Sequence, residues 1–209
     1  MGNKLANQII SVDFQKEFTS PKGLWYNPGQ SVNFIKETFV PYCREYNLRI
    51  FEIVSDYRQP RPGDSGDGCY PGTIGYESEI PTDVKSADVW IKCMNSPVWV
   101  REKIGLENTQ PGLPYQDPDL FTKWLARTIG QPENINFVTL IGLTVDWCVL
   151  CTAQELRWRG YSVKILEEGT DAVGGDEEYK KQLLSRSPLL NWATVISWSK
   201  LKGILAKQE

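Results

Sequence analysis

The chain has 209 residues, enough for one sizeable hydrophobic core. With 41% hydrophobic and 23% charged residues, it is expected to be a soluble globular protein rather than a disordered one. A formal net charge of −3, without a basic stripe, argues against a nucleic-acid partner. No apolar run approaches the roughly 18 residues of a membrane span, and the first residues lack a signal-peptide pattern. We therefore expect a cytoplasmic protein without a membrane partner.

The absence of histidine restricts the chemistry further than any other feature of the composition. It excludes Ser-His-Asp and Cys-His catalysis, HExxH zinc sites and any other metal site that needs imidazole. Acid–base chemistry must then use Asp, Glu, Lys, Cys or Tyr side chains. We predict neither a metal site nor a cofactor.

The first half of the chain alternates strand and helix patterns. Apolar runs predict a strand over 7–14, which contains Asp13, and another over 48–54. Between them, residues 31–46 have the spacing of an amphipathic helix, with Ser31 as its N-cap. Residues 57–75 are rich in glycine and proline and predict a long loop, of a kind that usually carries function.

The second half continues this alternation. Its expected elements, in chain order, are a strand over 89–92, a loop over 108–119, a helix over 119–130 capped by Asp117 or Asp119, a strand over 138–141, a helix from about 146 to 160, a strand over 163–166, a helix over 177–185 and a strand over 194–198. Strands that alternate with helices predict an α/β fold, a three-layer α/β/α sandwich with a mainly parallel, Rossmann-like sheet. We expect one domain over 1–209.

The stretch 138–160 combines a buried strand, a tight turn and a helix, and Cys148 lies in the first turn of that helix. In open α/β sheets, ligands bind just beyond the carboxyl ends of the strands. Unpaired N–H groups at a helix start favour a thiolate over a thiol. Cys148 is therefore the predicted nucleophile.

Two other strand ends also present reactive side chains, Asp13 and Lys92. The carboxyl ends of parallel strands share one edge of the sheet, so both residues could meet Cys148 there. Without imidazole, a buried carboxylate is the available base for a thiol, and a neighbouring ammonium group would stabilise the thiolate. The three residues form a consistent set for acyl transfer without a metal.

Four segments resemble the isochorismatase-like cysteine hydrolase superfamily, which includes nicotinamidases and N-carbamoyl amide hydrolases. They are VDFQKEF around Asp13, CYPGTIGYESEI over 69–80, ADVWIKCMNSPVW around Lys92, and GLTVDWCVLCTAQELRWRGYSV around Cys148. Their order, spacing and placement on strands match together, over roughly residues 8–175.

The resemblance implies roles for particular residues. Asp13 would be the general base, Lys92 its electrostatic partner and Cys148 the nucleophile. A cis peptide bond between Leu143 and Thr144 would turn the Thr144 amide, beside that of Cys148, toward the oxyanion. Relatives commonly form dimers or tetramers, so a homo-oligomer is expected.

The pocket residues are expected on loops and among aromatic side chains. The candidates for substrate binding are Phe18, Trp25, Arg58, Tyr70, Trp99 and Trp147. Arg58 could bind a substrate carboxylate or pair with Asp56, and the sequence leaves both open. Residues 101–119, with Trp99 and Tyr115, are a candidate lid.

The chain departs from its metal-binding relatives, which carry a histidine after the second-strand aspartate. Here Tyr57 and Arg58 follow Asp56. We therefore predict a metal-independent cysteine amidohydrolase that cleaves a small linear amide, carbamoyl or ureido compound through a thioester. The alternatives are a nicotinamidase without its usual metal, a thiol–disulfide oxidoreductase that uses the WCVLC motif with Cys151, and a catalytically idle binding protein.

Overall fold

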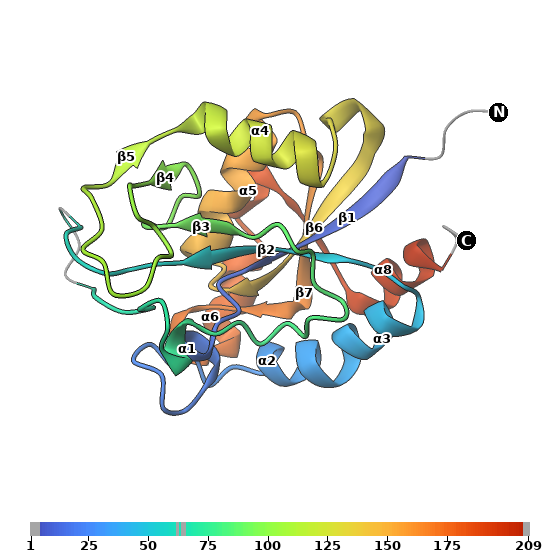
Figure 1. Ribbon diagram of the computed structural model, residues 1–209. Coiled ribbons are helices and arrows are strands. Elements are labelled where there is room, and N and C mark those ends of the chain that lie inside the picture. Colours follow the sequence, from blue (N-terminus) through green and yellow to red (C-terminus); the bar gives the residue numbers. More distant parts are fainter. Residues whose placement is uncertain (1–4, 62, 64–65, 207–209) are drawn as a thin grey trace.

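A six-stranded parallel sheet lies at the centre of the computed structural model, which describes residues 5–61, 63 and 66–206 (Figure 1). The strand order is β3-β2-β1-β6-β7-β8, and each neighbouring pair is parallel. The strands are β1 (Ala6–Val12), β2 (Ile50–Ser55), β3 (Trp90–Lys92), β6 (Ile135–Leu143), β7 (Val163–Asp171) and β8 (Thr194–Ile196). β6 is buried along almost its whole length, as expected for a central strand covered on both faces.

Helices cover both faces of the sheet. One face carries α4 (Pro118–Thr128) and α5 (Cys148–Trp158), and the other carries α8 (Trp198–Leu205) and the continuous helix formed by α2 (Ser31–Phe34), η1 (Ile35–Phe39) and α3 (Val40–Glu45) (Figure 1). Each layer packs on its own cluster of buried apolar side chains. The prediction of a three-layer α/β/α sandwich with a parallel sheet is confirmed.

Several elements are longer than their apolar runs. The strand expected over 138–141 continues through Gly142 to Leu143, and the strand expected over 163–166 continues to Asp171. Gly142 has φ 109°, and a Cβ atom there would lie 2.0 Å from the carbonyl oxygen of Val12. Glycine is therefore required where β6 passes close to β1, and it does not end the strand.

The helix expected over 31–46 is present, but Ser31 is not its N-cap. The residue before the helix is Gln30, and the Ser31 hydroxyl donates instead to Asp171 on β7. Asp171 is buried and also pairs with Lys180 at 3.2 Å. The Ser31 hydroxyl group, which in an N-cap would accept from a helix amide, therefore donates to a buried carboxylate instead.

Short elements are missing from the sequence-based assignment, because they have too few residues to show a period. They are α1 (Lys16–Thr19), η2 (Ile74–Tyr76), the antiparallel pair β4 (Trp99–Val100) and β5 (Tyr115–Gln116), η3 (Pro132–Asn134), η4 (Val173–Gly175) and α7 (Leu189–Trp192). The last strand ends at Ile196 because Trp198 begins α8. The helix α6 (Glu177–Leu184) agrees with its prediction, and Asp117 caps α4 by accepting from the Leu120 amide at 2.8 Å.

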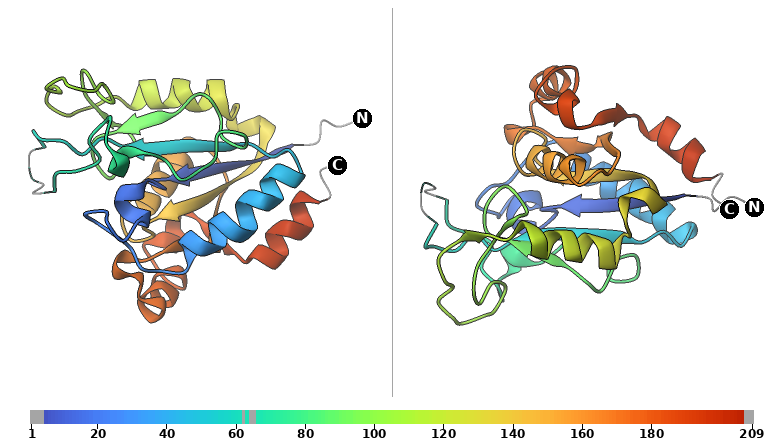
Figure 2. Two further views of the ribbon diagram at one scale, coloured as in Figure 1. Left: turned by 60° about the horizontal axis from the view of Figure 1, so that its bottom comes forward. Right: turned by 90° about the horizontal axis from the view of Figure 1, so that it is seen from above.

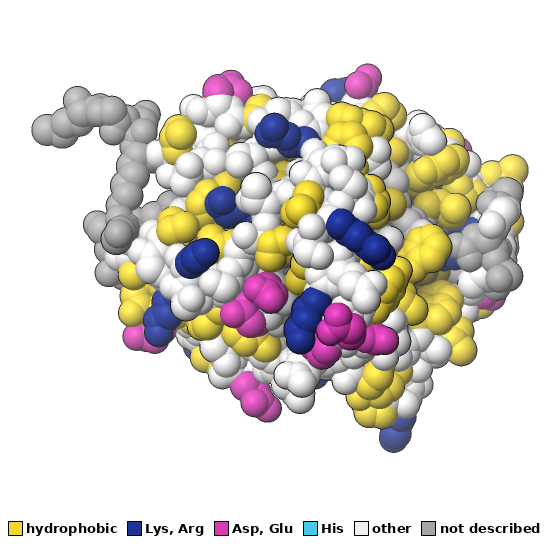
Figure 3. Space-filling view, turned by 180° about the vertical axis from the view of Figure 1, so that it is seen from behind, with side chains coloured by type: hydrophobic (Ala, Val, Ile, Leu, Met, Phe, Trp, Pro, Cys, Tyr) yellow, Lys and Arg dark blue, Asp and Glu magenta, His cyan; other side chains and the backbone are white. Residues whose placement is uncertain are grey.

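The long loops gather at one end of the molecule, opposite both termini, as Figure 2 shows. This is the end at which the parallel strands have their carboxyl ends. On the face shown in Figure 3, basic and acidic side chains are mixed rather than segregated. Among the described residues, no helix is both long enough and apolar enough to cross a bilayer.

Candidate active site

The structure brings together the three side chains expected from the sequence. Asp13 directly follows β1, Lys92 ends β3, and Cys148 begins α5. The Lys92 Nζ atom lies 2.8 Å from Asp13 Oδ2 and 3.5 Å from Cys148 Sγ. All three side chains are buried. An acid, an ammonium group and a thiol thus meet at the carboxyl edge of the sheet.

Two further side chains complete this cluster, and neither was expected from the sequence. Lys92 Nζ donates to Ser55 Oγ at 2.7 Å and to Tyr57 Oη at 2.6 Å. The Ser55 hydroxyl donates to Asp13 Oδ1 at 2.7 Å, and Tyr57 Oη lies 3.2 Å from Cys148 Sγ. Alternation of side chains along an extended strand is the signal that could have found them, because residues two apart project to the same side.

Burial dominates the protonation of the nucleophile. It raises the pKa of the Cys148 thiol well above the ordinary value; Lys92 opposes this shift and Asp13 adds to it. Burial lowers the pKa of Lys92, but the negative charges of Asp13 and Cys148 outweigh that effect and raise it. Burial therefore opposes the thiolate that the helix start was expected to favour. A base that removes the thiol proton would overcome this effect.

Two backbone amides lie beside the nucleophile at the wall of the pocket. The peptide bond between Leu143 and Thr144 is cis, as the resemblance implies. Thr144 and Cys148 both line the pocket, and Cys148 is the first residue of α5, where helix amides lack intrahelical acceptors. Within the described part of the chain, no acceptor is assigned to either amide. Both are therefore available to a substrate oxygen.

A pocket of about 550 Å³ opens beside Cys148. Of the candidate substrate-binding residues, Phe18, Trp25 and Trp147 line it, and the Phe18 and Trp25 rings are stacked with centroids 5.7 Å apart. The pocket is also lined by Asn27, Tyr57, Arg61 and Asn95, together with Tyr26, Gly66, Leu143, Val173 and Gly174. The lining is mainly apolar and includes five aromatic side chains, and Tyr57 and Asn95 place polar groups beside the thiol.

Arg58, Tyr70 and Trp99 do not line this pocket, contrary to expectation. Arg58 pairs with Asp56, the second of the two roles left open. Tyr70 is exposed and donates to Asp67, whereas Trp99 lies on β4, paired with β5. A position on or near the pocket loops did not predict that a side chain lines the pocket, because each of these side chains contacts a partner outside it.

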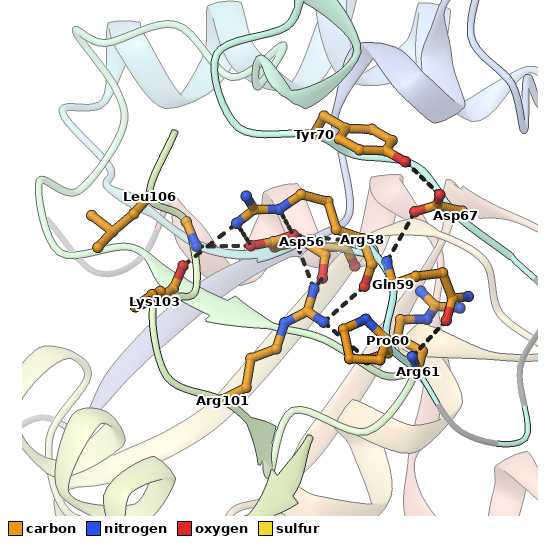
Figure 4. A network of polar contacts seen from close by, with 12 residues as sticks. Asp56, Arg58, Gln59, Pro60, Arg61, Asp67, Tyr70, Arg101, Lys103 and Leu106 are labelled. Atoms are coloured by element: carbon orange, nitrogen blue, oxygen red, sulfur yellow. Dashed lines mark hydrogen bonds and ion pairs between the residues drawn. The ribbon is translucent and has the colours of Figure 1, made fainter. Parts of the chain in front are cut away.

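Asp56 lies in a separate buried cluster (Figure 4). Its carboxylate accepts from Arg58 Nε at 2.9 Å and Nη2 at 2.6 Å, from Arg101 Nη2 at 3.1 Å and from the Gly105 amide at 2.9 Å. Burial raises the pKa of Asp56, but the hydrogen bond from Arg58, the Gly105 amide and the charge of Arg101 more than reverse this, so the pKa is lowered. Residues 101–105, from the candidate lid, therefore cover this cluster rather than the pocket.

The donor set at Asp56 does not fit a metal ion. Both carboxylate oxygens already accept hydrogen bonds from guanidinium or amide groups. The chain has no histidine to supply a second ligand. The two guanidinium groups of Arg58 and Arg101 already compensate the charge of this carboxylate.

Comparison with solved structures defines the class of fold: the chain has the fold of the isochorismatase-like hydrolases. No protein-family model matches the sequence, and no curated protein sequence matches it. The resemblance inferred from the four sequence segments is therefore confirmed at the level of the fold.

Three solved structures illustrate the likeness. N-carbamoylsarcosine amidase from Thermoplasma acidophilum has a TM-score of 0.60 and 20% identity, over 92% of this chain and 96% of that one. Pyrazinamidase of Pyrococcus horikoshii in complex with zinc has a TM-score of 0.62 and 18% identity, over 92% and 99%. An isochorismatase family protein from Desulfovibrio vulgaris has a TM-score of 0.66 and 16% identity, over 97% and 100%.

Proposed function

We propose that the protein is a metal-independent cysteine amidohydrolase that cleaves a C–N bond in a small linear amide, carbamoyl or ureido compound. The observation that carries this proposal is the contact of Lys92 with both Asp13 and Cys148 at the edge of the pocket. Solved proteins with this fold include an N-carbamoylsarcosine amidase, a nicotinamidase and a pyrazinamidase, all named for amide hydrolysis. Their names support the class of reaction.

The first half of the reaction forms a thioester. Asp13 removes the proton of the Cys148 thiol as the sulfur electron pair forms a C–S bond with the substrate carbonyl carbon. The carbonyl π electrons move to oxygen, and the Thr144 and Cys148 amides donate to that oxyanion. When the oxyanion collapses, the C–N bond breaks, and the nitrogen takes the proton from Asp13. Ammonia or an amine leaves, and an acyl group remains on sulfur.

The second half uses the same groups on water. Asp13 accepts a proton from a water molecule as the water oxygen attacks the carbonyl carbon of the thioester. The C–S bond breaks, the electron pair returns to sulfur, and the proton held by Asp13 restores the thiol. Lys92 remains an ammonium group throughout, since its raised pKa keeps it protonated. Its charge compensates a negative charge that moves between Asp13 and Cys148.

The proposal is tested by an ammonia-release screen over small amides, carbamoyl compounds and ureido acids, followed by mass spectrometry of the intact protein with the best substrate. We expect an acyl adduct that maps to the peptide containing Cys148. In Cys148→Ser, adduct and turnover should both be lost. Full turnover by Cys148→Ser would overturn the mechanism.

Nicotinamide hydrolysis is the second candidate, because the stacked Phe18 and Trp25 rings would accept a planar ring. Nicotinamide therefore belongs in the same screen, assayed with and without a chelator. The thiol–disulfide alternative is not supported. The contacts of Cys148 Sγ within the described residues are with Tyr57, Lys92 and Asn95 rather than with Cys151.

Three further expectations from the sequence stay predictions. We expect a small-molecule substrate without a nucleic-acid or membrane partner, a homo-oligomer and a cytoplasmic location. The oligomer is the easiest to check, by size-exclusion chromatography with light scattering. A mass of one chain across the working concentration range would contradict it.

A further inference from the structure

Tyr57 is buried beside the nucleophile, and the proposed reaction assigns no role to this tyrosine. Its backbone exchanges two hydrogen bonds with Gly68, at 3.1 and 3.2 Å. Its ring packs edge-on against Phe18 and Trp25, with centroids 6.4 and 5.8 Å away. The phenol is therefore held from the backbone and from the ring, and its hydroxyl group has little freedom to move.

The hydrogens of Lys92 decide which way the Tyr57 hydroxyl points. An ammonium group can donate three hydrogen bonds and can accept none. Four acceptors lie around Lys92 Nζ: Tyr57 Oη at 2.6 Å, Ser55 Oγ at 2.7 Å, Asp13 Oδ2 at 2.8 Å and Cys148 Sγ at 3.5 Å. The three oxygens are nearer than the sulfur and use the three hydrogens. Tyr57 Oη therefore accepts from Lys92, and its own hydrogen is directed elsewhere.

Two acceptors compete for that phenol hydrogen. Cys148 Sγ lies 3.2 Å from Tyr57 Oη, and Asn95 Oδ1 lies 3.4 Å from it. While Cys148 is a thiol, its S–H group can itself donate to Asn95 Oδ1 at 3.5 Å. Once the thiol proton has left, the sulfur is a charged acceptor, and hydrogen bonds to charged groups are about twice as strong as neutral ones. The phenol hydrogen then favours the sulfur.

We propose that Tyr57 is a catalytic residue, whose hydroxyl donates a hydrogen bond to the Cys148 thiolate whenever negative charge lies on the sulfur. This occurs as the thiol proton leaves for Asp13, and again as the thioester C–S bond breaks. No atom passes to or from Tyr57. Its role in turnover rests on the proposed function, whereas the hydrogen bond to the thiolate can be tested without a substrate.

The surroundings keep Tyr57 a donor. Burial raises the pKa of Tyr57 well above its ordinary value, and the negative charges of Cys148 and Asp13 raise it further. The phenol therefore does not act as a base. Other charged or titratable groups around the pair are Lys92, Arg61 with its guanidinium carbon 4.0 Å from the Tyr57 centroid, the buried thiol of Cys69, and Glu17 beside Cys69.

Tyr57→Phe removes the hydroxyl group and retains the ring. The rate at which iodoacetamide alkylates Cys148 is measured against pH by peptide mass spectrometry, which separates this thiol from the other four. We expect the alkylation to be about ten- to a hundredfold slower, with the pH profile displaced to higher pH, because the thiolate loses a charge-assisted hydrogen bond. If an amide substrate is found, kcat should fall by a similar factor.

Tyr161→Phe is the matched control, since Tyr161 is also buried and its hydroxyl donates to the Gly130 carbonyl at 2.7 Å. Cys148 in this variant should be alkylated at the same rate as in the unaltered protein.

If Tyr57→Phe does not fold, 3-fluorotyrosine placed at position 57 retains the hydroxyl group and makes it a stronger donor. The pH profile of Cys148 should then move to lower pH.

The outcomes separate this inference from the proposed function. An unchanged alkylation profile in Tyr57→Phe, or an unchanged profile with 3-fluorotyrosine, would overturn the role of Tyr57 even if the protein hydrolyses amides. A displaced profile in a protein that hydrolyses no compound of the screen would support the hydrogen bond and remove the amidohydrolase proposal.

Discussion

At the scale of single residues, the site is assembled from alternate positions on one extended segment. Ser55 and Tyr57 project toward Lys92, whereas Asp56 and Arg58 project to the other side and form an ion pair. The alternation of an extended chain thus divides four consecutive residues between the reacting cluster and a supporting cluster. The sequence identifies Asp56 as a carboxylate at the end of a strand. Only the structure shows that its side chain lies on the side of the segment away from the nucleophile.

The general base is tested by Asp13→Asn. The amide has nearly the same shape but cannot take the thiol proton, so kcat should fall by about a hundred- to ten-thousandfold. The measurement is ammonia release at neutral pH, with circular dichroism to verify the fold. Asp83→Asn, which alters an exposed carboxylate paired with Arg44, is the control. A loss of less than tenfold in Asp13→Asn would remove Asp13 from the mechanism.

The two cysteines of the WCVLC motif should differ sharply. Cys151 lies one helical turn beyond Cys148, and both are free thiols. We expect Cys151→Ala to retain ammonia release within about twofold, because a hydrolase needs only one thiol. Cys148→Ala should abolish it. Loss of activity in Cys151→Ala would return the thiol–disulfide mechanism to consideration.

At the scale of elements, the close approach of β6 to β1 positions the general base. Gly142 on β6 is opposite Val12, the residue before Asp13, and has no room for a Cβ atom. We predict that Gly142→Ala lowers the free energy of unfolding by about 2–4 kcal/mol, from steric overlap and an unfavourable positive φ. Denaturant unfolding measures this.

Gly203→Ala in α8 is the control for that change, because a Cβ atom there meets nothing within 4 Å. Alanine is the better helix former, so this variant should gain about 0.5–1 kcal/mol. Equal stabilities for the two variants would contradict the packing argument at Gly142.

The Asp56 cluster gives a prediction that depends on pH. Asp56→Asn would leave the guanidinium groups of Arg58 and Arg101 without their buried carboxylate, so the free energy of unfolding at pH 7 should fall by about 3–5 kcal/mol. The pKa of Asp56 is lower in the folded protein than in the unfolded chain. Its contribution is therefore complete above about pH 4, the unfolded value, and is lost as the pH falls through the folded value.

The stability of the unaltered protein and of Asp56→Asn should therefore converge at acid pH, as followed by urea unfolding at a series of pH values. Asp83→Asn is the matched change at an exposed ion pair with Arg44 and should leave stability almost unaltered. A difference at Asp56 that stays constant down to pH 2 would show that the effect is not electrostatic.

At the scale of the whole molecule, the sequence was sufficient for the layers and for the three strand-end residues. Long elements show their period, and a parallel sheet necessarily collects the ends that carry Asp13, Lys92 and Cys148. The pocket lining was predicted only in part. Arg58 and Trp99 lie elsewhere because their side chains follow partners that the sequence pattern does not show, such as Asp56 and the Thr109 carbonyl group for Arg58 and β5 for the strand of Trp99.

The pairing of Asp56 with two arginines has a practical consequence for a hydrolase of this kind. A metal ion must be acquired after synthesis and can be withdrawn, whereas guanidinium groups arrive with the polypeptide. Such an enzyme would be active as soon as its chain has folded. The metal-independent enzyme that we propose would then need no metal supply for its activity.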